Sequence, residues 1–540
     1  MTNSINEILE TDVILVIGSN TTEAHPVTGY RIRQAVQNGK KLIVADPRKI
    51  ELVKYADLWL RHRPGTDIAL LNGLAHVILR DDLWDKQFVA ERSEGFEEFK
   101  KTVAKYTPER VAEITGVEAG LIEQAARMYG KAEKATIIYA MGITQHASGT
   151  HNVMAVANLA ILTGNVGRPG TGVDPLRGQN NVQGACDMGC LPNYYPSYQP
   201  VDDPHVQSNF ERFWQAKLPQ EVGLTVTEMT DAARQGKIKC MYIMGENPVL
   251  SDPDGNRVVE ALQALEFLVV QDIFLTETAQ LAEVVLPAVT FAEKNGTFTN
   301  TERRIQLVRK AIDTTSSAKP DWQIIIELAQ KMGHFWQYPG GPEQIMEEIA
   351  RCAPLYGGIS HHRLEKGGIH WPCPTPGHPG TAYLHADGFA RGKGKFHSVE
   401  HVPPAEEPDE EYPLLLITGR MLYHFHTGTM SRRSHLEELR SEELAMMHPQ
   451  DAEAYGIKDK DRIVVESRRG KVTTRVQVTD FVPPGSIFMT FHFKETPTNV
   501  LTIASTDPIC KIPELKVCAV KIRVPFPGQA RRHPESFSCH

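Results

Sequence analysis

The stretch Asp12-Val13-Ile14-Leu15-Val16-Ile17-Gly18-Ser19-Asn20 decides the fold that this sequence predicts. Its apolar run is short and continuous, which is typical of a parallel strand buried on both faces. A helix is expected from about residue 25 to 38, and a second strand at 42–45 ends in Asp46-Pro47-Arg48. Strand, helix and strand in this order, with polar residues at both strand ends, predict a βαβ nucleotide-binding unit.

The turn after the first strand lacks the glycine fingerprint GxGxxG, which disfavours ordinary NAD binding. Gly65-Thr66-Asp67 precedes a helix expected at 68–79, with Thr66 or Asp67 as its cap. A phosphate could also bind at this helix end, and the two interpretations are compatible. Another apolar strand at 135–140 leads into Met141-Gly142-Ile143-Thr144-Gln145.

A second α/β unit repeats this order further along the chain. A strand at 239–244 ends in Gly245-Glu246-Asn247, and a strand at 267–270 ends in Gln271-Asp272. Two similar units predict two halves of a cofactor bound on one pseudo-symmetric scaffold. Asp272 suits a ribose or guanine edge, because its oxygens can accept two hydrogen bonds.

The last part of the chain changes character. Short strands at 414–420, 462–466 and 472–478, with a hairpin turn at Arg469-Gly470, predict a small β-barrel. The predicted fold is therefore α/β, with two Rossmann-like αβα domains that have parallel sheets and a C-terminal β-barrel domain. The predicted domains are 1–179, 180–345, an irregular connecting region at 346–408, and the barrel at 409–540.

Composition limits the function. The 540 residues are 41% hydrophobic and 23% charged, and the net charge of −8 argues against nucleic-acid binding. We find no apolar run of membrane-spanning length and expect a cytoplasmic protein without an export signal. The eight cysteines form no CxxC pair, so we interpret them as structural or incidental thiols. His146 with His151, and His424 with His426, lack a third metal ligand nearby and are interpreted as polar contacts.

Between the two α/β units lies the run Gly172-Val173-Asp174-Pro175-Leu176-Arg177-Gly178-Gln179-Asn180-Asn181-Val182-Gln183-Gly184-Ala185-Cys186-Asp187-Met188-Gly189. It has no helical or alternating period and is predicted to be a loop. Its amides suit a large polar ligand, and Arg177 is a cation that can hold a planar carboxylate through two hydrogen bonds. The run from Arg177 to Gly184 resembles the substrate-side loop of molybdopterin-dependent formate dehydrogenases, in their catalytic (alpha) subunit. The resemblance extends over essentially the whole chain.

The resemblance implies two molybdopterin guanine dinucleotides, which hold molybdenum or tungsten through four sulfur atoms. It implies that Arg177 holds formate beside the metal, and that Gln179 lies near the cofactor. The cofactor-binding residues expected in the first unit are Gly18, Asn20, Asp46, Arg48, Gly65, Asp67, Gly142 and Gln145. Those expected in the second unit are Gly245, Glu246, Asn247, Gln271, Asp272 and Thr276. Those expected in the barrel are Arg420, His424, Thr427, Asn499 and Lys516.

The expected reaction is the two-electron oxidation of formate to carbon dioxide, with electron-transfer iron–sulfur or hydrogenase subunits as partners. The family's 4Fe–4S domain and its metal-ligating cysteine or selenocysteine have no counterpart in this sequence. We therefore expect a portion of a longer selenoprotein that begins at an internal Met and is inactive alone. The alternatives are a related molybdopterin reductase, such as a nitrate reductase, and a non-catalytic guanine-dinucleotide-binding fragment.

Overall fold

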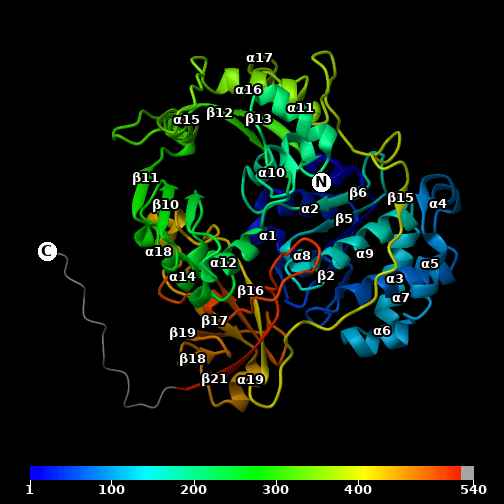
Figure 1. Cartoon of the computed structure of the whole chain (residues 1–540). Coiled ribbons are helices and arrows are strands. Elements are labelled where there is room, and N and C mark those ends of the chain that lie inside the picture. The colour runs from blue at the N-terminus through cyan, green and yellow to red at the C-terminus, as the bar shows by residue number, and fades with distance from the viewer. Residues whose placement is uncertain (525–540) are drawn as a thin grey trace.

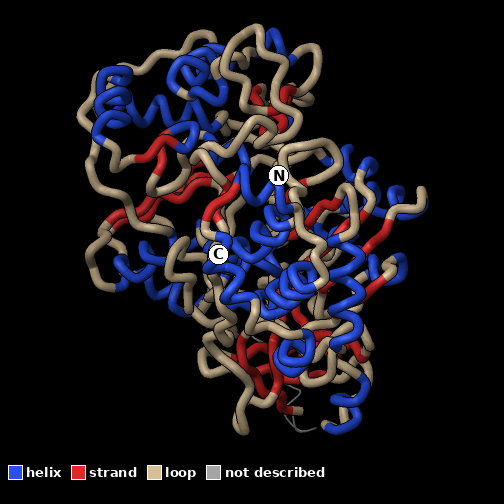
Figure 2. The backbone as a smooth tube through the Cα atoms, turned by 90° about the vertical axis from the view of Figure 1, so that its right-hand side faces the viewer, coloured by secondary structure: helices blue, strands red, loops and turns tan. Residues whose placement is uncertain are grey.

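The computed structural model describes residues 1–524, so Cys539 lies outside the described residues. Two α/β units, an antiparallel lobe and a C-terminal barrel make up this part of the chain (Figure 1). The barrel lies at one end of the molecule in both views, and the antiparallel lobe lies at the opposite end (Figure 2). The predicted fold class is confirmed.

The first unit is built on a five-stranded, wholly parallel sheet. In sheet order its strands are β3 (Leu58–Leu60), β2 (Lys41–Ala45), β1 (Val13–Ile17), β5 (Ala135–Tyr139) and β6 (Gly172–Pro175). The chain winds from β1 to β3 on one side and continues through β5 and β6 on the other. The direction of winding therefore reverses between β1 and β5, which is where ligands bind in open parallel sheets.

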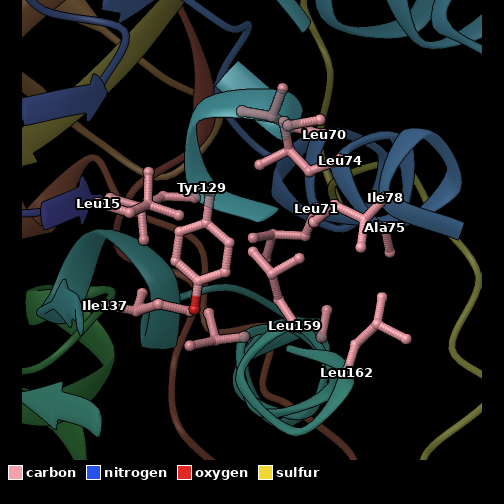
Figure 3. Packing of buried hydrophobic residues seen from close by; sticks show 14 of the residues in the cluster. Leu15, Leu70, Leu71, Leu74, Ala75, Ile78, Tyr129, Ile137, Leu159 and Leu162 are labelled. Carbon is pink, nitrogen blue, oxygen red and sulfur yellow. The ribbon is translucent and has the colours of Figure 1, made fainter. Parts of the chain in front are cut away.

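Helices cover both faces of this sheet, which explains the unbroken apolar run of β1. On one face Leu15 shares a core cluster with Leu71, Tyr129 and Leu159 (Figure 3). Ile14 belongs to the core cluster on the other face. Burial of such a side chain contributes about 1.5–3 kcal/mol. The first face carries α3 (Asp67–Arg80), α7 (Ala119–Gly130) and α9 (Gly149–Leu162), and the second carries η1 (Ile5–Glu10) and α2 (Pro26–Gln37). The remaining elements of this unit after β3 are α4 (Lys86–Arg92), β4 (Ser93–Glu94), α5 (Phe96–Val103), α6 (Pro108–Thr115) and α8 (Met141–Thr144).

The second unit has a three-stranded parallel sheet. Its strands are β9 (Cys240–Met244), β10 (Phe267–Asp272) and β11 (Val284–Pro287), and its helices are α12 (Val226–Arg234), α13 (Pro248–Ser251) and α14 (Gly255–Gln263). The core cluster of α12 and α14 with the strands lies on one face of the sheet. Tyr242 and Met244 alternate with the buried-face residues of β9 and are exposed, as is Phe267.

Residues on both sides of the predicted boundary at 345 form the antiparallel lobe. Its sheet contains β12 (Gly296–Thr299), β13 (Arg304–Val308) and β14 (Ile369–His370), and its helices include α15 (Asp321–Lys331), α16 (Pro342–Cys352) and α17 (His361–Leu364). The sheet and the helices α16 and α17 share one core cluster, with Ile305 and Met346 among its members. Phe396 and Val399 instead pack into the core of the first unit. The domain boundaries remain predictions.

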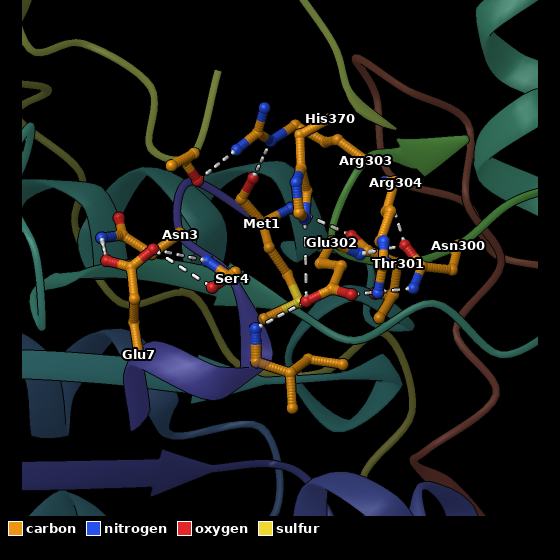
Figure 4. Close-up of polar contacts among 12 residues, drawn as sticks. Met1, Asn3, Ser4, Glu7, Asn300, Thr301, Glu302, Arg303, Arg304 and His370 are labelled. Carbon is orange, nitrogen blue, oxygen red and sulfur yellow. Dashed lines mark hydrogen bonds and ion pairs between the residues drawn. The ribbon is translucent and has the colours of Figure 1, made fainter. Parts of the chain in front are cut away.

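Arg303 ties the N-terminal residues to this lobe (Figure 4). Its side chain is 1% exposed, its Nε donates to the carbonyl oxygen of Met1 over 2.8 Å, and its Nη2 donates to Thr2 over 3.1 Å. The carboxylate of Glu302 accepts a hydrogen bond from the backbone N–H of Ile5 at 2.8 Å. These contacts fix the antiparallel lobe against the first unit.

The C-terminal part is a closed barrel of six strands, in the order β16-β20-β17-β19-β18-β21. The bounds are β16 (Leu414–Gly419), β17 (Leu444–Met447), β18 (Arg462–Glu466), β19 (Lys471–Val478), β20 (Ser486–Thr490) and β21 (Cys518–Arg523). β18 and β19 pair antiparallel around the predicted hairpin turn, with Ser467 N donating to Gly470 O.

One local prediction was wrong, and another was right only in part. The run 172–189 is not one loop, because it begins as β6 and ends as α10 (Val182–Asp187). Both elements are shorter than the window in which a periodic pattern can be detected. Thr66 is the N-cap residue of α3 by position, but neither it nor Asp67 makes the cap bond. The Thr66 hydroxyl instead donates to the carbonyl oxygen of Arg63 over 2.6 Å.

Candidate cofactor and substrate site

A cleft with about 1220 Å³ of open space lies between the carboxyl ends of β1, β2 and β5 and one end of the barrel. It therefore occupies the point at which the winding of the first sheet reverses. Twelve residues predicted to bind the cofactor line it: Gly18, Asn20, Asp46, Arg48, Gly65, Asp67, Gly142, Gln145, Gln179, Arg420, Asn499 and Lys516.

Two glycines let the strand ends of β1 and β5 meet at the floor of the cleft. The N–H of Gly142 donates to the carbonyl oxygen of Gly18 over 3.0 Å. A Cβ at Gly142 would lie 2.5 Å from that oxygen, and Gly18 has a φ of +57°. Only glycine satisfies both the close approach and the left-handed backbone without strain.

Three cations face the cleft with few acidic partners. Lys516 is buried and its Nζ donates to the carbonyl oxygen of Thr418 over 2.9 Å. Burial, together with the charges of Arg48 and Arg420, lowers the pKa of Lys516 to about 7. Burial also lowers the pKa of Arg420 to about 10. Asp46 is an acidic residue that lies among these cations, and its Oδ1 accepts a hydrogen bond from the backbone N–H of Arg48 at 2.8 Å.

This arrangement favours an anionic ligand. A buried lysine that has only a carbonyl partner gains most from a phosphate, because the anion would restore its charged state. The guanidinium of Arg48 lies 4.0 Å from the ring centre of Phe488, which holds it in position at the barrel. The donor set therefore fits a pyrophosphate-bearing ligand.

Polar atoms without partners also line the cleft. Ser19 Oγ, Asn499 Oδ1 and His25 Nδ1 are buried, and no residue within 1–524 offers them a hydrogen bond. Asn499 uses its Nδ2 to donate to Leu250 and Ser251, over 2.8 and 2.9 Å. Unsatisfied buried polar atoms are costly, so three of them at one cleft point to a polar ligand that satisfies them.

A buried ion pair forms part of the cleft wall. His62 Nε2 donates to Asp67 Oδ1 over 3.0 Å. Burial acts to lower the pKa of His62, but the Asp67 carboxylate outweighs it and raises that pKa above its ordinary value. The pair fixes Asp67 at the start of α3, where Gly65 also lines the cleft.

The Arg177 loop borders the same cleft. Gly178 and Gln179 are lining residues, whereas Arg177 itself lies beside them and is half-buried. The N–H of Arg177 donates to Thr301 Oγ1 over 2.9 Å, and its Nη1 donates to Cys186 Sγ over 3.5 Å. The run that carries Arg177 and Cys186 therefore meets the distant segment at Thr301.

The six residues predicted to hold a cofactor in the second unit do not line this cleft. Gln271 donates to Asp321 over 2.7 Å, and Asn247 donates to Glu277 over 2.9 Å. Asp272 Oδ1 accepts the N–H of Ile273 at 2.6 Å, so it stabilises its own turn. The Thr276 hydroxyl accepts the N–H of Ala279 at 3.1 Å. Gly245 follows β9 with its N–H bonded to Gln271 O at 2.8 Å, and Glu246 lines a separate pocket with Asp252.

Two predicted barrel residues also lie outside the cleft. His424 Nε2 donates to the carbonyl oxygen of Arg440 over 2.6 Å, and the Thr427 hydroxyl bonds that of Thr429 at 2.9 Å. The lining residue in this segment is His426, whose pKa burial and Arg420 lower to about 4. Sequence reasoning named both histidines of this pair as polar contacts but chose His424 for the cofactor, because an alternating pattern does not indicate which histidine faces a ligand; it therefore missed that His426 is the one that lines the cleft.

Sequence reasoning also missed Asp187, which follows the Arg177 loop. Its Oδ1 accepts from Gln183 and Tyr198 at 2.8 and 2.9 Å, and its Oδ2 accepts from Tyr356 and Trp371 at 2.6 and 2.7 Å. Burial raises the pKa of Asp187 despite these four donors. The network anchors α10 to the antiparallel lobe.

The described chain holds no group of three or more His, Cys, Asp or Glu side chains arranged to bind a metal ion. Its seven described cysteines are free thiols. No helix in residues 1–524 is both long enough and apolar enough to span a bilayer.

A parallel α/β scaffold with a cationic cleft, closed by a barrel, defines a protein that binds a large phosphate-bearing cofactor. Residues 1–331 match the family model described as molybdopterin oxidoreductase, and residues 414–519 match the molybdopterin dinucleotide binding domain. The chain belongs to the molybdopterin oxidoreductase family.

Several characterised proteins are similar over nearly the whole chain. The F420-dependent formate dehydrogenase subunit alpha of Methanocaldococcus jannaschii is 51% identical, over 97% of this chain and 78% of its own length. Formate dehydrogenase H of Escherichia coli is 42% identical, over 97% of this chain and 74% of its own length. The structure of acetylene hydratase from Pelobacter acetylenicus superposes with a TM-score of 0.74 at 22% identity, over 96% of this chain and 80% of that one. That likeness shows the fold alone.

Proposed function

We propose that this chain is the catalytic part of a formate dehydrogenase. The substrate is formate, the products are carbon dioxide, a proton and two electrons, and the cofactor is a pair of molybdopterin guanine dinucleotides with molybdenum or tungsten. The observation that carries the proposal is the position of the Arg177 loop, whose Gly178 and Gln179 line the cationic cleft. The similarity to formate dehydrogenase alpha subunits supports it.

One dinucleotide would occupy the cleft of the first unit. Arg48, Arg420 and Lys516 would neutralise its pyrophosphate, and the close contact of Gly18 with Gly142 would let the backbone approach it. Asp67, fixed by His62, would accept hydrogen bonds from N–H groups of its base.

A second dinucleotide is proposed for the second unit, at Gly245, Glu246, Asn247, Gln271, Asp272 and Thr276. The side chains of Gln271 and Asn247 already have partners within the chain. Recognition there would therefore use backbone groups, or would require these side chains to exchange partners. His424 and Thr427 of the barrel remain proposed contacts of the cofactor. Their contacts would likewise use backbone groups or require their side chains to exchange partners.

Arg177 would bind the carboxylate of formate. A guanidinium offers two parallel N–H groups to two oxygens, which fixes both the position and the direction of the anion. The oxygens held in this way direct the C–H bond away from Arg177, which contributes to catalysis through orientation. The bound cofactor supplies the two-electron redox chemistry.

Electrons leave to a partner, for which we propose an iron–sulfur or hydrogenase subunit. The enzyme to be tested is therefore the metal-loaded protein with its partner subunits. Formate-dependent reduction of a one-electron dye tests the proposal, with two dye molecules reduced for each carbon dioxide formed. Reduction of nitrate without oxidation of formate would instead support the nitrate reductase alternative. Bound guanine nucleotide without metal would support the non-catalytic alternative.

A further inference from the structure

His25 connects the cleft to Arg177. It lies between α1 (Thr21–Ala24) and α2, with φ −143° and ψ 63°. Pro26 follows it, and a residue before proline is disfavoured in the helical conformation. The chain therefore bends at His25, and its side chain lines the cleft instead of the helix surface.

The two ring nitrogens of His25 have different surroundings. Nε2 lies 2.8 Å from the carbonyl oxygen of Arg177. A carbonyl oxygen only accepts, so Nε2 carries the proton in this contact. Nδ1 is buried and has no partner among residues 1–524. Burial lowers the pKa of His25, which keeps the ring neutral and leaves Nδ1 as an acceptor.

The position of Arg177 depends on hydrogen bonds to its backbone, because its guanidinium forms no ion pair with any residue of 1–524. Its backbone N–H is held by Thr301 and its carbonyl oxygen by His25. Removal of the His25 contact would free one side of the peptide that carries the arginine.

We propose that His25 is a positioning residue that couples occupation of the cleft to the orientation of Arg177. Its Nε2–H holds the Arg177 carbonyl oxygen, and its Nδ1 accepts a hydrogen bond from an N–H or O–H group of the ligand in the cleft. The proposal rests on the proposed function, because it concerns the residue that binds formate there.

A pair of substitutions separates the two roles. The side-chain amide of glutamine lies at about the position of histidine Nε2, and that of asparagine at about the position of Nδ1. His25→Gln keeps the donor to Arg177 and loses the acceptor, whereas His25→Asn shows the opposite pattern. His205→Ala is the matched control, because His205 is exposed and its side chain makes no described hydrogen bond.

The experiment uses the assembled, metal-loaded enzyme and measures KM and kcat for formate, melting temperature, and metal and guanine nucleotide content after prolonged dialysis. We expect His25→Asn to raise KM up to about tenfold with little change in kcat, which corresponds to one lost hydrogen bond. We expect His25→Gln to keep a normal KM but to lose cofactor at least several-fold faster. His205→Ala should resemble the wild type in every measurement.

The proposed coupling between the cleft and Arg177 is contradicted if His25→Gln raises KM for formate as much as His25→Asn does. It is also contradicted if both variants equal His205→Ala in every measurement. A wild-type enzyme that does not oxidise formate contradicts the proposed function instead. In that case the dialysis experiment still tests the role of Nδ1. If Arg177→Lys raises KM while His25→Asn does not, only the inference about His25 fails.

Discussion

The N–H of Gly142 donates to the carbonyl oxygen of Gly18 over 3.0 Å, and this contact joins the ends of β5 and β1 at the floor of the cleft. The two strands are neighbours in the sheet, so the contact continues their ladder into the ligand-facing turns. Because neither residue has a side chain, the cleft is open at the point where its ligand must approach most closely.

Gly142→Ala should therefore impair both stability and cofactor binding. The new Cβ would lie 2.5 Å from Gly18 O and 2.7 Å from Gly18 Cα, so the backbone must shift. Overpacking of this kind costs about 1–3 kcal/mol. We expect a lower melting temperature and a lower metal content per chain.

Gly120→Ala is the control for this substitution. Gly120 lies in α7, and the one atom near its added Cβ is Glu118 Oε1 at 3.7 Å. Alanine is favoured over glycine in a helix, so the control should be as stable as the wild type or more so. Equal behaviour of the two variants would contradict the account of the cleft floor.

Lys516→Met tests whether the cleft binds phosphate. Methionine keeps the apolar stem of the side chain and removes the charge, so the fold should be retained. We expect metal and guanine nucleotide content to fall at least several-fold, measured on protein purified in parallel with the wild type. Lys471→Met is the control, because Lys471 is exposed at the start of β19. Normal cofactor content in Lys516→Met would show that the phosphates bind elsewhere.

Glu443 gives the barrel a predictable dependence on pH. Its Oε1 accepts the N–H of Thr490 at 2.8 Å, and burial raises its pKa from 4.5 to about 7. Between these values the folded state binds more protons than the unfolded state, so the free energy of unfolding falls as the pH rises. The contribution lost is about 3 kcal/mol at full ionisation.

Glu443→Gln should remove this dependence. The variant should gain stability relative to the wild type between pH 5 and pH 8, as measured by denaturant unfolding at both pH values. Glu442→Gln is the control for this substitution, because Glu442 is exposed. A wild type that becomes more stable across this interval, relative to Glu443→Gln, would refute the assignment.

The elements of the first unit were predictable because burial dictates their composition. A strand covered on both faces is mostly apolar: β1 is apolar at every position, and β5 at every position except Thr136, whose hydroxyl donates to Asp174 Oδ2. Its helices are long enough to show their period. The strand ends that form the cleft follow from the topology, so Asp46 and Gly142 could be located at strand ends from the sequence, whereas their assignment to the cofactor came from the resemblance.

Other features could not be predicted, for reasons that are also physical. α10 has six residues, which is too few to display a helical period. The antiparallel lobe pairs β13 with β14 across more than sixty residues of chain, and no local pattern specifies such pairing. The partners of His25 and Asp187 depend on long-range contacts for the same reason. The role of Arg177 in binding formate came from the resemblance to formate dehydrogenases. The spacing of residues alone does not indicate that role.

The central claim is that Arg177 binds the carboxylate of formate beside the cofactor. The most direct test is the steady-state KM for formate of Arg177→Lys in the assembled, metal-loaded enzyme, with metal content measured on the same sample. Lysine keeps the charge but loses the two parallel donors, so we expect KM to rise about 10- to 100-fold at unchanged metal content. A KM equal to that of the wild type, at equal metal content, would contradict the account.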